Sequence, residues 1–225
     1  MSDANEKMWA EVDRYITGTI PHNDAAQEAA IAANHAAGLP AIDVSAPQGK
    51  MLHVLALALG AKRVLEIGTL GGYSTIWLAR ALPADGRVVT LEFAAKHAEV
   101  ARKNLDAAGV GAKVEIRVGA AAESLTKLEA EGAAPFDLIF IDADKGNNPI
   151  YVQWALKLAR KGTVIIVDNV IRDGAVLEAE STDTNIVGTR RMFDLVGKEP
   201  RLTATAIQTV GGKGYDGFVL AVVTS

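Results

Sequence analysis

The chain has 225 residues, of which 49% are hydrophobic and 22% charged, and its formal net charge is −4 at pH 7. A chain of this length and composition can bury a substantial core, which excludes global disorder. The acidic balance argues against a nucleic-acid partner, and the absence of cysteine excludes disulfides, thiolate metal sites and cysteine nucleophiles. The polar start, MSDANEK, is unlike a signal peptide, and no stretch reaches the ~18 apolar residues of a membrane span. We therefore expect a soluble, cytoplasmic protein with no membrane partner.

The first part of the chain, residues 5–60, is rich in alanine and has a helical pattern. Pro21, the segment GLPAIDVSAP and Gly60 interrupt that pattern, which predicts several short helices. The sequence contains no repeat and no low-complexity linker. We therefore expect a single domain, 1–225, in which residues 1–60 form a helical cap and residues 61–225 the core.

From Arg63 onward, short runs of Val, Ile and Leu alternate with helical patterns. The runs are RVLEIG, GRVVTLE, AKVEIRVG, FDLIFIDA and GTVIIVDNV. This alternation predicts parallel strands joined by crossover helices, with helices on both faces of an α/β sheet. The tail, RLTATAIQTVGGKGYDGFVLAVVTS, holds two strand-like runs around a glycine-rich turn, which predicts an antiparallel hairpin at one sheet edge.

In open α/β sheets ligands bind beyond the carboxyl ends of the strands, so the residues after each run are the candidates for function. The first strand ends in LEIGTLGGYST, where Gly68 and the glycines that follow let the backbone approach a ligand closely. The spacing is not G-x-G-x-x-G, and Glu66 would repel a pyrophosphate but suit a ligand with a positive amino group. A capping turn without a ligand is the alternative.

The second strand ends at Glu92, 24 residues after Gly68. A carboxylate at about this distance from a glycine turn accepts hydrogen bonds from ribose hydroxyls in such folds. A solvated surface glutamate is the alternative for Glu92. After the third strand, Gly119 and Ala120 allow backbone groups to approach an adenine ring, although small residues are also common where a strand passes into a helix.

The fourth and fifth strands end in charged or polar residues: Asp142, Asp144 and Lys145 after one, and Asp168 and Asn169 after the other. If the two strands are neighbours, Asp142, Asp168 and Asn169 come together. Three oxygen ligands without Cys or His suit a hard cation such as Mg²⁺. A buried lysine beside a cation can act as a base.

A purely structural interpretation of these strand ends is also open. The carboxylates would cap helices, and Lys145 would neutralise Asp144. The segment NNP is itself a good helix start, with Asn148 as the cap and Pro149 in the first turn, so the aspartates are not needed for capping.

Three blocks of sequence together resemble a known family. They are VLEIGTLGGYSTIWLARALPADGRVVTLE, FDLIFIDADK and VIIVDNVIRDG. From about Ser45 to the C-terminus the chain is similar to the cation-dependent class I O-methyltransferases of the catechol and caffeoyl-coenzyme A branch, which use S-adenosylmethionine. The resemblance implies a Rossmann-like sheet of seven strands with an antiparallel last strand, extra N-terminal helices and a homodimer. The tail segment YDGF loosely matches a family Asp-Gly segment, and a hairpin turn explains Asp216 and Gly217 equally well.

The resemblance also implies the residues of the site. The implied cofactor contacts are Glu66, Gly68, Tyr73, Ser74, Glu92, Ala120 and Asp142. The implied metal ligands are Asp142, Asp168 and Asn169, for Mg²⁺, Mn²⁺ or Ca²⁺, and the implied catalytic residues are Asp142 and the base Lys145.

The expected activity is methyl transfer from S-adenosylmethionine to a hydroxyl of a catechol-like or other aromatic vicinal diol. Three alternatives stay open: a methyltransferase that acts on RNA, a cofactor-binding module without turnover, and an NAD-dependent oxidoreductase. The oxidoreductase would leave the cluster DADK and DN unexplained.

Overall fold

The computed structural model describes residues 3–20 and 22–225, so Pro21 lies outside the described residues. The chain divides into two compact units. One is Asp13–Ser124, and the other is Leu125–Ser225 with the N-terminal residues up to Val12. The division into a cap of residues 1–60 and a core stays a prediction. In the part of the chain described here, no helix has the length and apolar character needed to cross a membrane.

Three helices precede the first strand, as expected: α1 (Asp3–Thr19), α2 (Ala25–Ala36) and α3 (Ala46–Ala58). Asp24 caps α2 because its carboxylate accepts the N–H groups of Ala26 and Gln27, and the Gln27 side chain accepts the Asp24 N–H in return. Ser45 caps α3 through the N–H of Gln48. Local polar residues therefore begin two of the helices that follow the predicted interruptions.

The unit Asp13–Ser124 contains three parallel strands in the order β3-β2-β1: β1 (Arg63–Ile67), β2 (Arg87–Glu92) and β3 (Val114–Val118). Every residue of β1 and β2 after the first is buried. This explains why apolar residues stand next to each other instead of alternating with polar ones, as Val64 and Leu65 do in β1 and Val88 and Val89 in β2. Helices α4 (Tyr73–Ala81) and α5 (Ala95–Ala107) pack against them.

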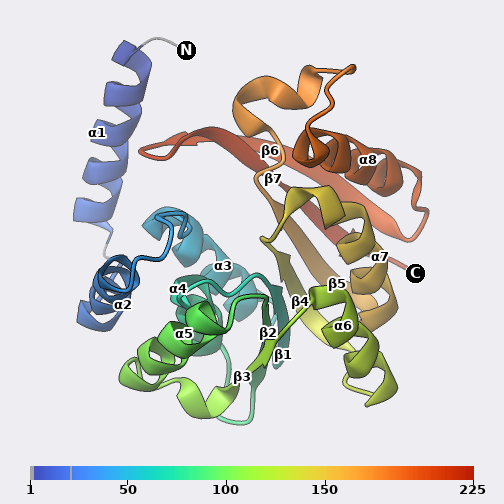
Figure 1. The fold of residues 1–225 in the computed structure, drawn as a ribbon, viewed down its shortest axis with the longest axis horizontal. Coiled ribbons are helices and arrows are strands. Elements are labelled where there is room, and N and C mark those ends of the chain that lie inside the picture. The colour runs from blue at the N-terminus through green and yellow to red at the C-terminus, as the bar shows by residue number, and fades with distance from the viewer. Residues whose placement is uncertain (1–2, 21) are drawn as a thin grey trace. The chain divides into compact units, whose positions relative to one another are not determined.

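The other unit carries the remaining strands. Its elements are α6 (Ala121–Ala130, which begins in the first unit), β4 (Phe136–Ile141), α7 (Asn148–Leu158), β5 (Ala159–Asp168), α8 (Thr184–Lys198), β6 (Leu202–Gly211) and β7 (Gly214–Val223). Strands β4 and β5 are parallel, whereas β7 is antiparallel to both β5 and β6. Figure 1 shows β6 and β7 as a long hairpin. The predicted hairpin is thus confirmed.

The seven strands have the order β3-β2-β1-β4-β5-β7-β6. This confirms the expected fold class, a Rossmann-like α/β sheet with parallel strands and an antiparallel C-terminal pair, surrounded by helices. One detail of the tail is corrected. The hairpin turn lies between Gly211 and Gly214, so Asp216 and Gly217 belong to strand β7 and do not form the turn.

Candidate functional site

The carboxylate of Glu66, near the end of β1, is fully buried. Its Oε1 accepts the hydroxyl of Ser74 at 2.7 Å, and its Oε2 accepts the hydroxyls of Thr75 at 2.5 Å and Thr90 at 2.7 Å. Three donors stabilise a charge that would otherwise be costly to bury. Glu66 and Ser74, two predicted cofactor contacts, therefore lie in direct contact with each other.

Glu92, the last residue of β2, binds the glycine turn. Its Oε2 accepts the backbone N–H groups of Thr69 at 3.2 Å and Leu70 at 2.8 Å. Its Oε1 accepts the N–H of Ala94 at 2.9 Å and lies 3.2 Å from Nδ1 of His97. The structure brings this predicted ribose ligand to the same turn as Glu66. The contact with His97 was not predicted, since no spacing in the sequence marks that histidine.

The glycine turn after β1 is held by buried amides from α2 and α5. Gly68 has φ 102° and Gly72 has φ 83°, conformations that favour glycine. Nδ2 of Asn104 donates to the carbonyl of Gly71 at 2.9 Å and to Oδ1 of Asn34 at 3.0 Å. A Cβ at Gly71 would lie only 1.8 Å from Oδ1 of Asn34. The turn thus depends on two asparagines that the sequence did not single out.

Tyr73, a predicted cofactor contact at the start of α4, is almost fully buried. Its hydroxyl donates to Oδ1 of Asn23 at 2.5 Å. Burial raises the pKa of Tyr73 above its ordinary value, so the phenol stays neutral and able to donate.

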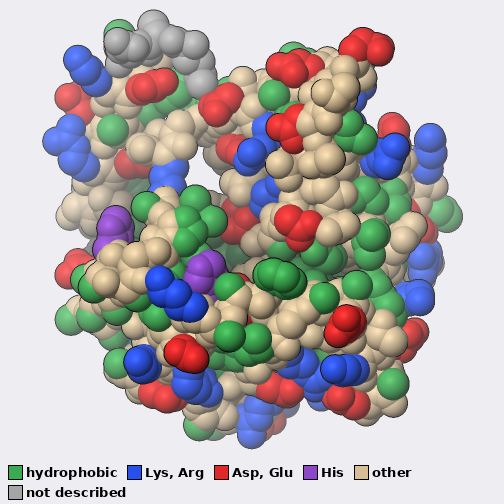
Figure 2. Space-filling view, viewed as in Figure 1, with side chains coloured by type: hydrophobic (Ala, Val, Ile, Leu, Met, Phe, Trp, Pro, Cys, Tyr) green, Lys and Arg blue, Asp and Glu red, His purple; other side chains and the backbone are tan. Residues whose placement is uncertain are grey.

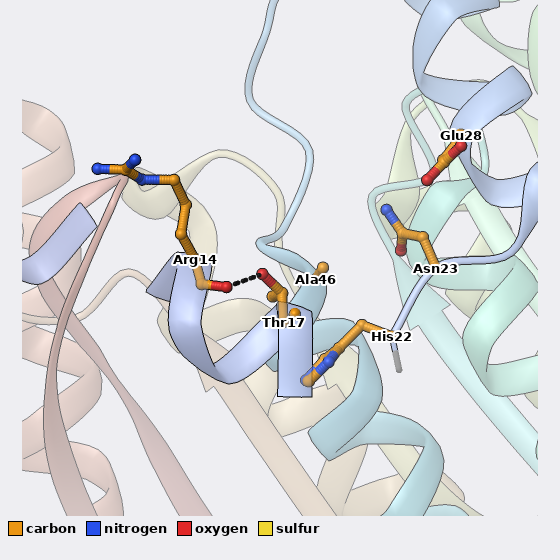
Figure 3. Close-up of a pocket in the computed structure, with 7 residues that line it drawn as sticks. Arg14, Thr17, His22, Asn23, Glu28 and Ala46 are labelled. Carbon is orange, nitrogen blue, oxygen red and sulfur yellow. Dashed lines mark hydrogen bonds between the residues drawn. The ribbon is translucent and has the colours of Figure 1, made fainter. Parts of the chain in front are cut away.

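Asn23 also lines a pocket of about 550 Å³ in the unit Asp13–Ser124, with Arg14, Thr17, His22 and Glu28 among the other lining residues. Figure 3 shows the side chains of Asn23 and Glu28 apart from those of Arg14, Thr17 and His22, which lie on the other side of the pocket. Through Asn23 the pocket is linked to Tyr73. Sequence reasoning missed this pocket because its walls come from helix ends with no motif.

The turn after β3 is open. Gly119 has φ 132°, and among the described residues none other than Gly119 and its two chain neighbours has an atom within 4 Å of the place where a Cβ would be. The carbonyl of Ala120 accepts the N–H groups of Glu123 and Ser124, both at 3.1 Å, and so starts helix α6. Backbone at this turn is therefore accessible to a flat ligand such as the predicted adenine.

In the other unit, the ends of β4 and β5 lie side by side. Ile141 is paired with Val167 in a parallel register, and the next residues are Asp142, directly after β4, and Asp168, the last residue of β5. Such strands lie about 4.8 Å apart. Asp168 is buried and Asn169 follows it with φ 53°. The structure thus brings the three predicted metal ligands to one edge of the β4–β5 pair.

Lys145 is also buried, with 7% of its surface exposed. Its Nζ lies 2.7 Å from Oδ1 of Asp142. The structural interpretation, in which Lys145 neutralises Asp144, is therefore wrong about its partner.

Asp144 instead organises the start of α7. Its Oδ1 accepts the hydroxyl of Tyr151 at 2.5 Å, and its Oδ2 accepts Nδ2 of Asn147 at 2.5 Å. Burial and the neighbouring Asp144 carboxylate raise the pKa of Tyr151 well above its ordinary value.

The expected capping role of Asn148 is wrong by one residue. Asn147 is the N-cap of α7, and Asn148 is the first helical residue. Pro149 follows it and lies in the first turn, as predicted. The side chain of Asn148 is fully buried, and neither its Nδ2 nor its Oδ1 has a hydrogen-bond partner among the described residues. The physical reason is the short 3-10 turn Lys145–Asn147, which leads directly into α7, so that the helix begins one residue earlier than predicted.

Comparisons with known proteins agree with this architecture. The family model described as O-methyltransferase matches residues 23–222. A catechol O-methyltransferase of Mycobacterium tuberculosis is 58% identical over 213 residues, which cover 95% of this chain and 95% of that protein.

Two crystal structures are similar over the whole fold. An O-methyltransferase of Bacillus cereus in complex with S-adenosylhomocysteine (SAH) has a TM-score of 0.96 and 54% identity, covering 97% of this chain and 100% of its own. The O-methyltransferase TomG of Streptomyces achromogenes, in complex with S-adenosylmethionine, has a TM-score of 0.95 and 48% identity, covering 100% of both chains. The family and enzyme class implied by the motifs are confirmed: the chain belongs to the O-methyltransferase family.

Proposed function

We propose that this O-methyltransferase transfers the methyl group of S-adenosylmethionine to a hydroxyl of a catechol-like or other aromatic vicinal diol, with the help of a divalent cation. The name of the Mycobacterium tuberculosis relative supports the diol, and the ligands of the Bacillus cereus and Streptomyces achromogenes structures support the cofactor.

The observation that carries the proposal is the register of β4 and β5. It puts Asp142 and Asp168 at adjacent strand ends, with the amide of Asn169 next in the chain. Two carboxylates and an amide oxygen are the hard donors that Mg²⁺, Mn²⁺ and Ca²⁺ take in proteins, so the residues fit such a cation. We propose that Asp142, Asp168 and Asn169 hold it.

The cofactor residues also fit their ligand. The buried carboxylates of Glu66 and Glu92 lie at the turn after β1, which suits a cofactor with a positive sulfonium and amino group. We propose that Glu66, Gly68, Tyr73 and Ser74 contact its methionine part, Glu92 its ribose, and Ala120 its adenine. We propose Asp142 as a further contact.

The residues then have separate tasks in the reaction. A phenolic hydroxyl has a pKa of ~10, so little of it is ionised at neutral pH. Lys145 takes the proton of the attacking hydroxyl, and Asp142, bonded to its Nζ, holds the amine in place. When bound, S-adenosylmethionine supplies a methyl group on a sulfonium, and a divalent cation stabilises an oxyanion. Two adjacent hydroxyls can share one cation, which favours a diol over a single phenol.

Two alternatives remain distinguishable by experiment. On the face in Figure 2, Lys and Arg side chains are interspersed with Asp and Glu rather than gathered, which does not favour an RNA substrate. A binding module without turnover would take up the cofactor and methylate nothing. The family match leaves the NAD-dependent oxidoreductase without support.

The test is a screen of catechols, flavonoids and caffeoyl esters with labelled S-adenosylmethionine, with and without EDTA. We expect methylation of at least one diol, loss of activity with EDTA, and recovery with excess Mg²⁺. Activity that ignores the chelator would contradict the metal assignment, and methylation of RNA alone would contradict the substrate class.

Variants of two lysines sharpen the screen. Replacing Lys145 with methionine should lower kcat by about 10²- to 10⁴-fold, since general-base catalysis contributes that much. Lys198→Met, at an exposed position of α8, is the matched control and should leave kcat unchanged. Equal activity of the two variants would exclude Lys145 as the base.

The quaternary structure and location belong to the same proposal. Helix α1 exposes Met8, Val12 and Tyr15, by 53%, 50% and 73% of their surfaces, along one side of the helix. This apolar stripe supports a homodimer, which light scattering on the intact chain tests.

We also propose a cytoplasmic location, checked by cell fractionation.

A further inference from the structure

We infer that Asp216 is a positioning residue for the proposed cation site. Its carboxylate fixes the path of the chain after Asp168 and thereby the position of Asn169. The inference rests on the proposed function, because it concerns two of the residues proposed to hold the cation.

A single carboxylate oxygen binds three backbone groups. Oδ1 of Asp216 accepts the N–H of Ile171 at 2.9 Å, that of Arg172 at 3.0 Å and that of Gly217 at 2.9 Å. Two of these donors lie about 45 residues earlier in the chain than Asp216. Two bonds to one oxygen therefore join the segment after β5 to the start of β7.

Asn169 lies between two points of attachment to β7. Before it, Asp168 is paired with Phe218 in the last rung of the β5–β7 ladder. After it, the N–H of Val170 donates to the carbonyl of Gly217 at 3.0 Å, and the bonds to Asp216 follow directly. With both sides held, the backbone of Asn169 has little freedom to move.

The backbone here needs such support. Asn169, Arg172 and Asp173 have φ values of 53°, 58° and 55°, in the left-handed region that residues with a Cβ rarely adopt. Three such residues within five positions persist only where surrounding contacts hold them. From strand β7, the carboxylate of Asp216 holds Arg172 directly, and it also holds Ile171, which lies between Asn169 and Arg172.

The close approach of β7 depends on the glycine beside Asp216. A Cβ at Gly217 would lie 2.3 Å from the carbonyl oxygen of Ile207 and 2.7 Å from Cγ1 of Ile171. The Asp-Gly pair therefore combines an acceptor with the space that lets the acceptor reach its donors. Because the hairpin turn lies at Gly211–Gly214, turn formation does not explain this pair.

The first experiment measures binding of Mg²⁺ alone to the cofactor-free protein by calorimetry. Asp216→Ala should weaken Mg²⁺ binding by about 10- to 100-fold, as loss of a residue that orients metal ligands does. Asp216→Asn keeps an acceptor oxygen at the same place and should retain most of the affinity. Asp216→Glu keeps the charge but moves the oxygens, and it should bind Mg²⁺ more weakly than Asp216→Asn. Asp194→Ala, at an exposed position of α8, is the control for loss of one carboxylate.

Two further readouts separate positioning from a general loss of stability. In Asp216→Ala, the amides of Ile171 and Arg172 should exchange with solvent faster than in the wild type. Its kcat should recover at saturating Mg²⁺, because the ligands themselves are intact, whereas a merely unfolded fraction would lower kcat at every Mg²⁺ concentration. If Asp216→Ala does not fold, the order of Asp216→Asn and Asp216→Glu decides.

The outcomes distinguish a failure of the role of Asp216 from a failure of the proposed cation-dependent function. Wild-type protein that binds no Mg²⁺ would remove the cation from the proposed function. Wild-type protein that binds Mg²⁺ while Asp216→Ala binds it equally well would overturn only the role of Asp216. Equal weakening in Asp216→Asn and Asp216→Ala would also overturn it, since charge and not position would then be what matters.

Discussion

At the scale of single residues, the two aspartates after β4 have distinct partners, and those partners separate their roles. Asp142 is bonded to the buried Lys145, whereas Asp144 is bonded to Tyr151 and Asn147 at the start of a helix. The family resemblance implies roles for Asp142 and none for Asp144, but the sequence DADK does not show which partner each aspartate has. Only the structure assigns one to the lysine and the other to α7.

The bond between Tyr151 and Asp144 predicts a dependence of stability on alkaline pH. The pKa of Tyr151 is raised in the native state by burial and by the Asp144 carboxylate, while in the unfolded chain it is about 10. Above about pH 10 the unfolded state therefore binds fewer protons than the native state, and the free energy of unfolding falls as the pH rises. The stabilisation is fully present below that pH.

We expect urea unfolding to show a steeper loss of stability above about pH 10 in the wild type than in Tyr151→Phe. At neutral pH, Tyr151→Phe should itself lower the free energy of unfolding by about 1.5–3 kcal/mol, the range for a hydrogen bond to a charged group. Parallel pH profiles of the two proteins would contradict the raised pKa.

At the scale of elements, the glycine turn after β1 and the helices around it form one packed set. Oδ1 of Asn34 occupies the space beside Gly71, so Gly71→Ala should lower the free energy of unfolding by about 1–3 kcal/mol through overpacking. Asn34→Ala should also be destabilising, because it removes an acceptor from Asn104. The double variant lacks the clash. Its loss of unfolding free energy should therefore be smaller than the sum of the two single-variant losses by about 0.5–3 kcal/mol. Strict additivity in urea unfolding would argue against the contact.

The same elements show what the sequence can and cannot reveal. The strands were predictable because buried parallel strands contain consecutive apolar residues, as LIFI in β4 and VIIV in β5 show. The sequence also marked the acids at the strand ends as candidates for function, because a charge after such a run is unusual. The roles of Asn34, Asn104 and Asp216 could not be predicted, since each acts through partners about 30 to 75 residues away along the chain. A polar residue in a helix or strand looks solvated until its long-range partner is known.

At the scale of the whole molecule, ligand binding should raise thermal stability through simple linkage. With SAH at about 100 times its dissociation constant, the expected stabilisation is about 2.7 kcal/mol. For a chain of this size that corresponds to an increase in Tm of about 5–11 °C. NAD⁺ at the same concentration should leave Tm unchanged, and an increase with NAD⁺ but not with SAH would contradict the proposed cofactor.

The hydrogen bonds of Asn34 also bear on how a ligand enters. One way for a ligand to enter would be a movement of the N-terminal helices, residues 1–60, away from the sheet. However, the side chain of Asn34 on α2 packs into the turn after β1. Opening by movement of α2 would leave the amide of Asn104 without two of its three acceptors, Oδ1 of Asn34 and the carbonyl of Ala30, which is costly in a dry interior. Helix α2 therefore stabilises that turn, and entry of the cofactor must depend on the movement of other segments.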